Sequence, residues 1–131
     1  MICESIQQEE KNEPSFDIPV DEDFFLTILG SHLMKNEGGQ LVQVPTLSCL
    51  KKSRLVALYF SAHWCGPCRR FTPMLCEMYL HLRATFAVHG LELIFVTSDH
   101  DNSSFKKYFS TMPWLAMPFE EASRRRSLSQ R

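Results

Sequence analysis

A five-residue motif near the middle of the chain carries the clearest chemistry: Trp64, Cys65, Gly66, Pro67 and Cys68. Two cysteines separated by two residues are a weak signal alone, because zinc sites and chance also produce that spacing. Here the motif follows an apolar, strand-like run at residues 55–61 and opens a long helical pattern. Its position at a strand-to-helix junction favours redox chemistry of the two thiols.

The junction also predicts how the two thiols differ. Pro67 suits the first turn of a helix, where its missing N–H costs little, so Cys65 falls at or just before the helix N-terminus. Unpaired N–H groups and the positive end of the helix dipole favour an anion there, which should lower the pKa of Cys65 below the ~8.5 of a free thiol. Cys68 returns to the same face one turn later, so the two sulfurs can meet. We expect Cys68 to be more buried and less reactive.

The expected reaction is thiol–disulfide exchange. Cys65 attacks a substrate disulfide, a mixed disulfide forms, and Cys68 resolves it. Gly66 gives the loop its freedom, and the flat apolar ring of Trp64 offers a contact for the substrate.

A zinc site is the main chemical alternative. Cys65 and Cys68 would then be two of its ligands, with His63 or Cys76 as further ones. Cys76 lies two helical turns beyond Cys68, too far to join one tetrahedral centre easily, and the chain has no second CxxC motif. We therefore expect no metal at this site. Cys49 and Cys76 are better explained as small core residues.

Hydrophobic periodicity outlines an α/β framework around the motif. Apolar runs at residues 55–61 and 91–97 predict two strands that are central and buried on both faces. A helical stripe lies between them and consists of Phe71, Leu75, Met78, Leu82 and Phe86. Strand, helix and strand in this order predict a right-handed parallel βαβ unit.

Smaller elements are expected on either side of this unit. They are a helix at 24–29 capped by Asp21 or Asp23, a β-hairpin from 31–35 and 40–44, a helical turn within 45–52, and helices at 105–110, capped by Ser103 or Ser104, and 120–128. Asp99, His100 and Asp101 follow the second strand and could suggest a cation site. Helix capping and a solvated loop explain these three residues better.

Length and composition exclude several classes of protein. The 131 residues suit one domain, and 44% hydrophobic and 22% charged residues are ordinary for a globular chain. A net charge of −1 argues against nucleic-acid binding, and no apolar run reaches the ~20 residues of a membrane helix. No signal peptide is recognisable, and five cysteines do not suit a disulfide framework. We therefore expect a cytoplasmic protein, with the nucleus as the other compartment.

Charge divides the chain into three parts. Eight acids and one base lie between residues 4 and 23, so we expect residues 1–20 to be a flexible acidic arm. Residues 21–126 would form the folded domain. Residues 127–131 would be a solvated tail behind the basic cluster of Arg124, Arg125 and Arg126.

Residues 56–73 and 105–119 resemble the tryparedoxin and nucleoredoxin branch of the thioredoxin superfamily. The first stretch holds the CxxC motif, and the second contains MPWLAMPF, which is distinctive of the branch. The match covers roughly residues 24–126. It implies a thioredoxin fold, Cys65 as nucleophile and Cys68 as resolving thiol. It also implies disulfide-bearing protein or small-thiol substrates and no metal or organic cofactor, while the electron donor stays unassigned.

The chain also departs from the branch. Gly66 stands where the branch usually has proline, and Tyr59 stands where thioredoxins carry a buried acid that handles protons. The family's cis-proline loop, later strands and last helix are not found after Arg126. Pro118 is not the cis-proline, because it belongs to the MPWLAMPF motif. We therefore expect an incomplete domain with an exposed sheet edge that favours self-association. The alternative function is a truncated, catalytically weak chain that acts by binding, or an inert fragment.

Overall fold

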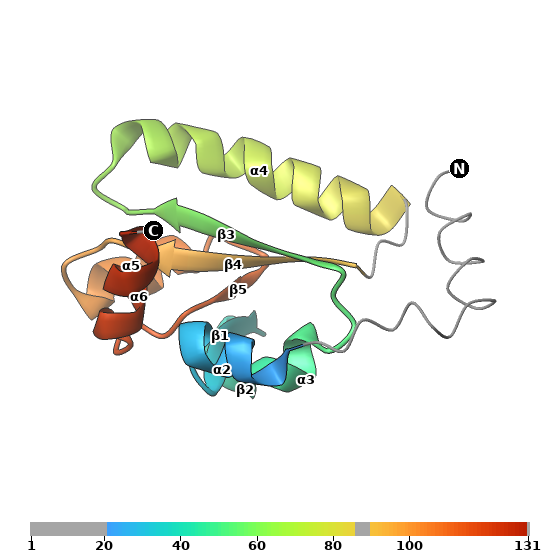
Figure 1. Ribbon diagram of the computed structural model, residues 1–131. Coiled ribbons are helices and arrows are strands. Elements are labelled where there is room, and N and C mark those ends of the chain that lie inside the picture. The colour runs from blue at the N-terminus through green and yellow to red at the C-terminus, as the bar shows by residue number, and fades with distance from the viewer. Residues whose placement is uncertain (1–20, 86–89, 131) are drawn as a thin grey trace.

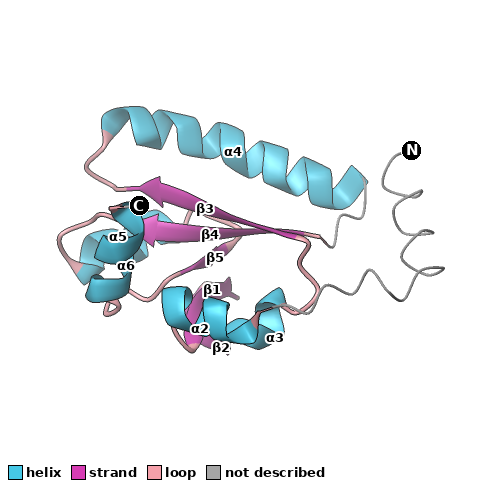
Figure 2. Ribbon diagram, viewed as in Figure 1, coloured by secondary structure: helices cyan, strands magenta, loops and turns pink. Residues whose placement is uncertain are grey.

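The computed structural model describes residues 21–85 and 90–130 as a mixed sheet with helices on both faces (Figure 1). The acidic arm expected at residues 1–20 lies outside this description. The elements in chain order are α2 (Glu22–Leu29), β1 (His32–Glu37), β2 (Gln40–Pro45), α3 (Thr46–Leu50), β3 (Leu55–Ser61), α4 (Gly66–Thr85), β4 (Leu91–Thr97), α5 (Asn102–Phe109), β5 (Leu115–Ala116) and α6 (Ala122–Ser129). Figure 2 distinguishes the helices from the strands. Among the described residues, no helix is long and apolar enough to cross a membrane.

Five strands form one sheet in the order β2-β1-β5-β4-β3. β3 and β4 run parallel, from Leu55 opposite Leu91 to Ser61 opposite Thr97, and α4 is the crossover between them. β5 continues the parallel part beside β4, and β1 is antiparallel to both β5 and β2. The predicted α/β fold with a parallel βαβ core is confirmed.

Successive side chains of β4 point to opposite faces of the sheet and enter two separate cores. Leu93 and Phe95 pack on the side of α4 and α5. Ile94 and Val96 pack on the side of α2, α3 and α6. In Figure 1, α4 lies above the sheet and α2 and α3 lie below it. Helices therefore cover both faces of β4, as its apolar pattern predicts.

Local signals set the small elements before β3 as expected. Gly38 and Gly39 form the turn between β1 and β2 with φ of +58° and +82°. A two-residue hairpin turn of type I′ needs two positive φ angles, which glycine adopts without strain. Asp21 caps α2, because its carboxylate accepts a hydrogen bond at 3.1 Å from the Phe24 N–H.

The prediction of a central strand at residues 55–61 is wrong for the described chain, because β3 lies at the edge of the sheet. β3 pairs with β4 on one side, and no described strand pairs with its other side. Leu55 and Phe60 are 62% and 42% exposed. An apolar pattern on both faces reports the layers above and below a strand and contains no information about its lateral neighbours. The exposed sheet edge expected from the sequence is found here.

The predicted apolar stripe of α4 is only partly buried: Leu75 packs against the core. Phe71 and Met78 belong to that stripe but are 49% and 53% exposed. Tyr79 is buried instead, with its ring 5.5 Å from that of Trp114. Trp114 lies just before β5, so this contact joins two distant parts of the chain, which the helical periodicity of α4 alone does not encode. Phe86 lies outside the described residues.

The C-terminal helix α6 runs past the predicted domain boundary at Arg126. Leu128 is 8% exposed and packs into the core that α2 and α3 share. The Arg124 side chain also joins the fold, because its Nε donates to the Thr27 carbonyl at 3.0 Å. Residues 127–129 therefore belong to the folded unit, and the predicted solvated tail from residue 127 is wrong for them.

Candidate active site

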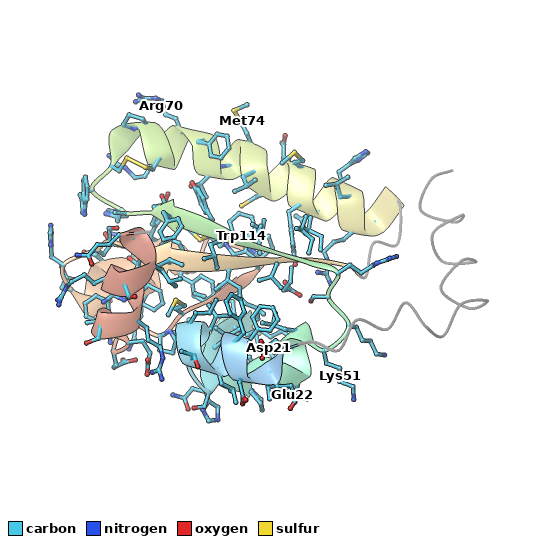
Figure 3. The ribbon with its side chains drawn as sticks, in the orientation of Figure 1. Asp21, Glu22, Lys51, Arg70, Met74 and Trp114 are labelled. Atoms are coloured by element: carbon cyan, nitrogen blue, oxygen red, sulfur yellow. A yellow bond between two sulfur atoms is a disulfide. The ribbon has the colours of Figure 1, made fainter. Side chains whose placement is uncertain are left out.

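Cys65 and Cys68 form a disulfide where β3 ends and α4 begins, with their Cα atoms 5.2 Å apart (Figure 3). The Cys65 carbonyl accepts a hydrogen bond from the Arg69 N–H at 3.0 Å, which makes Cys65 the N-cap of α4. Pro67 occupies the first turn, where its missing N–H has no helical partner to lose. Gly66 has no positive φ, so the turn does not require glycine there. The two sulfurs meet across one helical turn, as the spacing predicts.

The backbone of α4 points at one of the two sulfurs. The N–H of Cys68 donates to Cys65 Sγ at 3.3 Å, the hydrogen bond that an N-cap side chain receives from the third helical residue. The first N–H groups of a helix have no carbonyl partner within it, and they favour negative charge. A thiolate at Cys65 in the reduced protein is therefore our expectation. Both cysteines are half-buried.

Trp64 forms an exposed platform next to Cys65. Its side chain is 61% exposed, and its Nε1 donates to the Ser98 carbonyl at 3.2 Å. The indole stacks on His100 with the ring centroids 6.1 Å apart and the planes inclined by 11°. Both partners belong to the loop after β4, which therefore fixes the orientation of the indole. The flat contact predicted for a substrate is open to solvent.

A buried carboxylate joins the two loops at the site. Asp99 is 5% exposed, and its Oδ1 accepts the backbone N–H of His63 at 2.8 Å. Its Oδ2 accepts the Thr97 hydroxyl at 2.9 Å. The sequence interpretation of Asp99 as a solvated loop residue is wrong, because its partner lies 36 positions earlier in the chain. No local pattern marks that contact.

Asp101 in the same loop does cap a helix. Its carboxylate accepts the Ser104 N–H at 2.7 Å and starts α5. Ser103 and Ser104, the predicted caps, lie inside the helix instead. The backbone N–H and then the hydroxyl of Ser104 stabilise the carboxylate and hold the pKa of Asp101 below its ordinary value.

Arg125 fastens α6 to the end of β4. Its Nη1 donates to the Thr97 carbonyl and its Nη2 to the Phe119 carbonyl, each at 2.7 Å. The guanidinium also lies over the Phe119 ring, 4.9 Å from the centroid. Burial lowers the pKa of Arg125. One member of the basic cluster is therefore a structural residue.

Four hydroxyl groups form a hydrogen-bonded chain behind the start of α4: Tyr59, Thr72, Tyr108 and Ser61. The oxygen of Thr72 lies 2.7 Å from that of Tyr59 and 2.6 Å from that of Tyr108, which is 2.7 Å from Ser61 Oγ. Thr72 also donates to the Cys68 carbonyl at 2.9 Å, which links these hydroxyls to the first turn of α4. Burial raises the pKa of Tyr108. The sequence singled out Tyr59 alone, because the other three hydroxyls have no distinguishing pattern.

Cys49 and Cys76 are free thiols packed half-buried against the two cores. Burial raises the pKa of both, which is the opposite of what a reactive thiol needs. The Cys76 thiol donates a hydrogen bond from Sγ to the Thr111 carbonyl at 3.6 Å. Within residues 21–85 and 90–130, no group of three or more His, Cys, Asp or Glu side chains could hold a metal ion. The zinc alternative therefore has no ligand set in this part of the chain.

Comparison with known proteins decides the family. A family model described as thioredoxin-like matches residues 52–131, more than half of the chain. The chain belongs to the thioredoxin-like family. Among curated relatives, the sequence is 46% identical over 98 residues to probable nucleoredoxin 1 of Arabidopsis thaliana, covering 75% of this chain and 16% of that protein. It is 42% identical over 106 residues to human nucleoredoxin, covering 81% of this chain and 23% of that protein.

Solved structures give the same thioredoxin-like fold. Native tryparedoxin I from Crithidia fasciculata superposes with a TM-score of 0.67 at 36% identity, covering 82% of this chain and 68% of that one. Tryparedoxin II in complex with glutathionylspermidine superposes with a TM-score of 0.68 at 30% identity, covering 83% and 69%. The resemblance to the tryparedoxin and nucleoredoxin branch is thus confirmed. The thioredoxin-like chain spans less than a quarter of the two nucleoredoxins it matches.

Proposed function

We propose that this thioredoxin-like chain is a thiol–disulfide oxidoreductase with Cys65 as nucleophile and Cys68 as resolving thiol. The observation that carries the proposal is the hydrogen bond from the Cys68 N–H to Cys65 Sγ at the N-terminus of α4. It singles out Cys65 as the sulfur that the helix stabilises as a thiolate. Cys68 lies in reach for the second step, because the two sulfurs already bond to each other.

The exchange balances as two displacements. The Cys65 thiolate attacks one sulfur of a substrate disulfide, forms a mixed disulfide and releases the other substrate sulfur as a thiolate. The Cys68 thiol loses its proton to solvent and attacks Cys65 Sγ, which releases the second substrate thiolate. The substrate gains two electrons, and the protein is left with the Cys65–Cys68 disulfide. A dithiol or low-molecular-weight thiol must then reduce that disulfide for a further cycle.

Disulfide-bearing proteins and small thiol compounds are the proposed substrates. The indole of Trp64 supports this, because it is 61% exposed and offers a flat apolar surface beside Cys65. We also propose that the chain works in a reducing compartment, the cytoplasm or the nucleus, because Cys49 and Cys76 are unpaired thiols. Fluorescence imaging of the tagged full chain tests the compartment, and secretion would contradict it.

The function is tested by reduction of insulin disulfides with dithiothreitol as electron source. We expect Cys65→Ser to lower the rate to that of dithiothreitol alone. Cys76→Ser is the matched control, because it removes a thiol from the same helix without touching the disulfide, and it should keep the wild-type rate. Equal rates for wild type and Cys65→Ser would exclude catalysis by this chain.

Among the described residues no strand pairs with the outer side of β3, and this favours a second candidate function, binding of a partner without catalysis. Leu55 and Phe60 are exposed on this strand, and unpaired strand edges recruit other chains. Self-association through the edge is the form of this proposal that the sequence suggested. Sedimentation of the wild-type chain tests it, with Phe60→Lys as the edge variant. A monomer at all concentrations would contradict self-association.

A further inference from the structure

The guanidinium of Arg70 lies over the segment between the two active cysteines. A Cβ atom built on Gly66 would meet a single group within 4 Å, Nη1 of Arg70 at 3.8 Å. Gly66 directly follows Cys65, so this cation lies close to the motif that a substrate disulfide must approach. Figure 3 shows Arg70 at the same end of α4 as the disulfide.

The cation has no acid to neutralise it. Arg69 and Arg70 are both exposed, and neither forms an ion pair with any residue that the structure describes. Glu77 is the first acid along α4, seven residues beyond Arg70 and therefore about 10 Å further along the helix axis. The start of α4 thus presents two guanidinium groups to solvent.

The acids at this end of the sheet are already engaged. Asp99 is buried and binds the His63 N–H, and Asp101 caps α5. Glu121 pairs with Arg124, and Glu120 lies near Arg125 and stabilises its charge. Asp101 remains a charged carboxylate near His100, whereas no described acid pairs with Arg69 or Arg70.

We propose, on the basis of the proposed function, that the site selects disulfides flanked by carboxylates, in the form of acidic segments of disulfide-bearing proteins. A guanidinium is a rigid donor fork that matches a carboxylate, and an exposed pair of this kind favours association by about two- to fivefold. Arg70 is the main recognition residue, because its Nη1 lies 3.8 Å from a Cβ built on Gly66, the residue next to Cys65. The exposed Trp64 indole, stacked on His100, supplies an apolar contact next to Cys65 in the chain.

A charge near Cys65 also stabilises the thiolate, and this effect must be separated from recognition. Thiolate stabilisation changes the rate with every disulfide by the same factor. Recognition changes the ratio between an acidic and a basic substrate. The ratio of two rate constants therefore isolates the proposed contact.

The experiment uses the full chain carrying Cys68→Ser, which stops the reaction at the mixed disulfide. Two peptide disulfides are compared that differ only in Glu or Lys on either side of the cysteine, and each rate is divided by the rate with dithiothreitol alone. We expect the acidic peptide to react about three- to tenfold faster at low salt. In 0.5 M salt, the ratio should fall toward one, because exposed charges are screened.

Arg70→Glu should lower the acidic-to-basic ratio by about tenfold, and Arg70→Gln should bring it close to one. Lys51→Glu is the matched control, because it makes the same charge change at the opposite end of the molecule (Figure 3). It should leave the ratio within about twofold of the parent value. Oxidised glutathione is a small disulfide that also carries carboxylates. If it reacts faster than the acidic peptide, the site prefers small anionic disulfides, and the proposal that it selects acidic protein segments is overturned.

Failure of the substrate preference can be distinguished from failure of the proposed function. Equal rates with both peptides, or an Arg70→Glu ratio equal to that of Lys51→Glu, overturn the substrate preference and leave the oxidoreductase function intact. A chain that forms no mixed disulfide with either peptide overturns the proposed function, and the substrate preference with it.

Discussion

The hydroxyl chain behind α4 gives a prediction whose magnitude follows from the contacts. Tyr108→Phe removes two hydrogen bonds, to Thr72 and to Ser61. Thr72 keeps Tyr59 and the Cys68 carbonyl as partners. Ser61 is 4% exposed and loses the one side-chain partner that the structure gives it.

The two losses differ in cost. The bond lost at Thr72 contributes about 1 kcal/mol, because its other partners remain. The hydroxyl of Ser61 becomes a buried polar group without a partner, which costs about 1–2 kcal/mol. We therefore expect Tyr108→Phe to lower the free energy of unfolding by about 2–3 kcal/mol. For a chain of this size the melting temperature should fall by roughly 8–12 °C.

A double-mutant cycle separates this mechanism from a simple loss of packing. Ser61→Ala in the wild-type background removes one bond and should cost about 1 kcal/mol. In the Tyr108→Phe background, Ser61→Ala removes a buried hydroxyl that has already lost its partner. It should then leave the free energy of unfolding unchanged or raise it by about 1 kcal/mol. Urea unfolding followed by circular dichroism measures all four proteins. Additive costs of the two substitutions would refute the reasoning, as would a Tyr108→Phe cost under about 0.5 kcal/mol.

Two further outcomes follow from the C-terminal helix and from the α5 cap. Leu128→Ala should lower the free energy of unfolding by about 2–3 kcal/mol in urea titrations, because the Leu128 side chain packs into a hydrophobic core. A change under about 0.5 kcal/mol would mean that the last turn of α6 is solvated. The pKa of Asp101 is lowered in the folded state, so its contribution to stability is present above the ordinary aspartate value of 3.8 and is lost as the pH falls through the lower folded value. The stability difference between wild type and Asp101→Ala should therefore shrink below about pH 4, and a difference independent of pH would contradict the cap.

The active disulfide and the strand β4 were predictable from the sequence because their signals are local. The CxxC spacing matches one helical turn, and Pro67 marks the helix start, so the meeting of the two sulfurs needs no distant residue. Residues 91–97 alternate between two cores because a strand places successive side chains on opposite faces. Gly38 and Gly39 set the hairpin turn through their own backbone preferences.

Tertiary structure alone decided the surroundings of that disulfide. The carboxylate of Asp99 and the N–H of His63 meet across 36 residues, and the hydroxyls of Ser61 and Tyr108 meet across 47. The position of β3 at the sheet edge depends on which strands lie beside it, which its own apolar pattern does not encode. Short-range preferences specify helices, strands and turns, whereas burial and pairing depend on the residues that the completed fold brings together. For that reason the sequence determined the pairing of Cys65 and Cys68 at the start of α4, and the fold determined the groups that support and surround them.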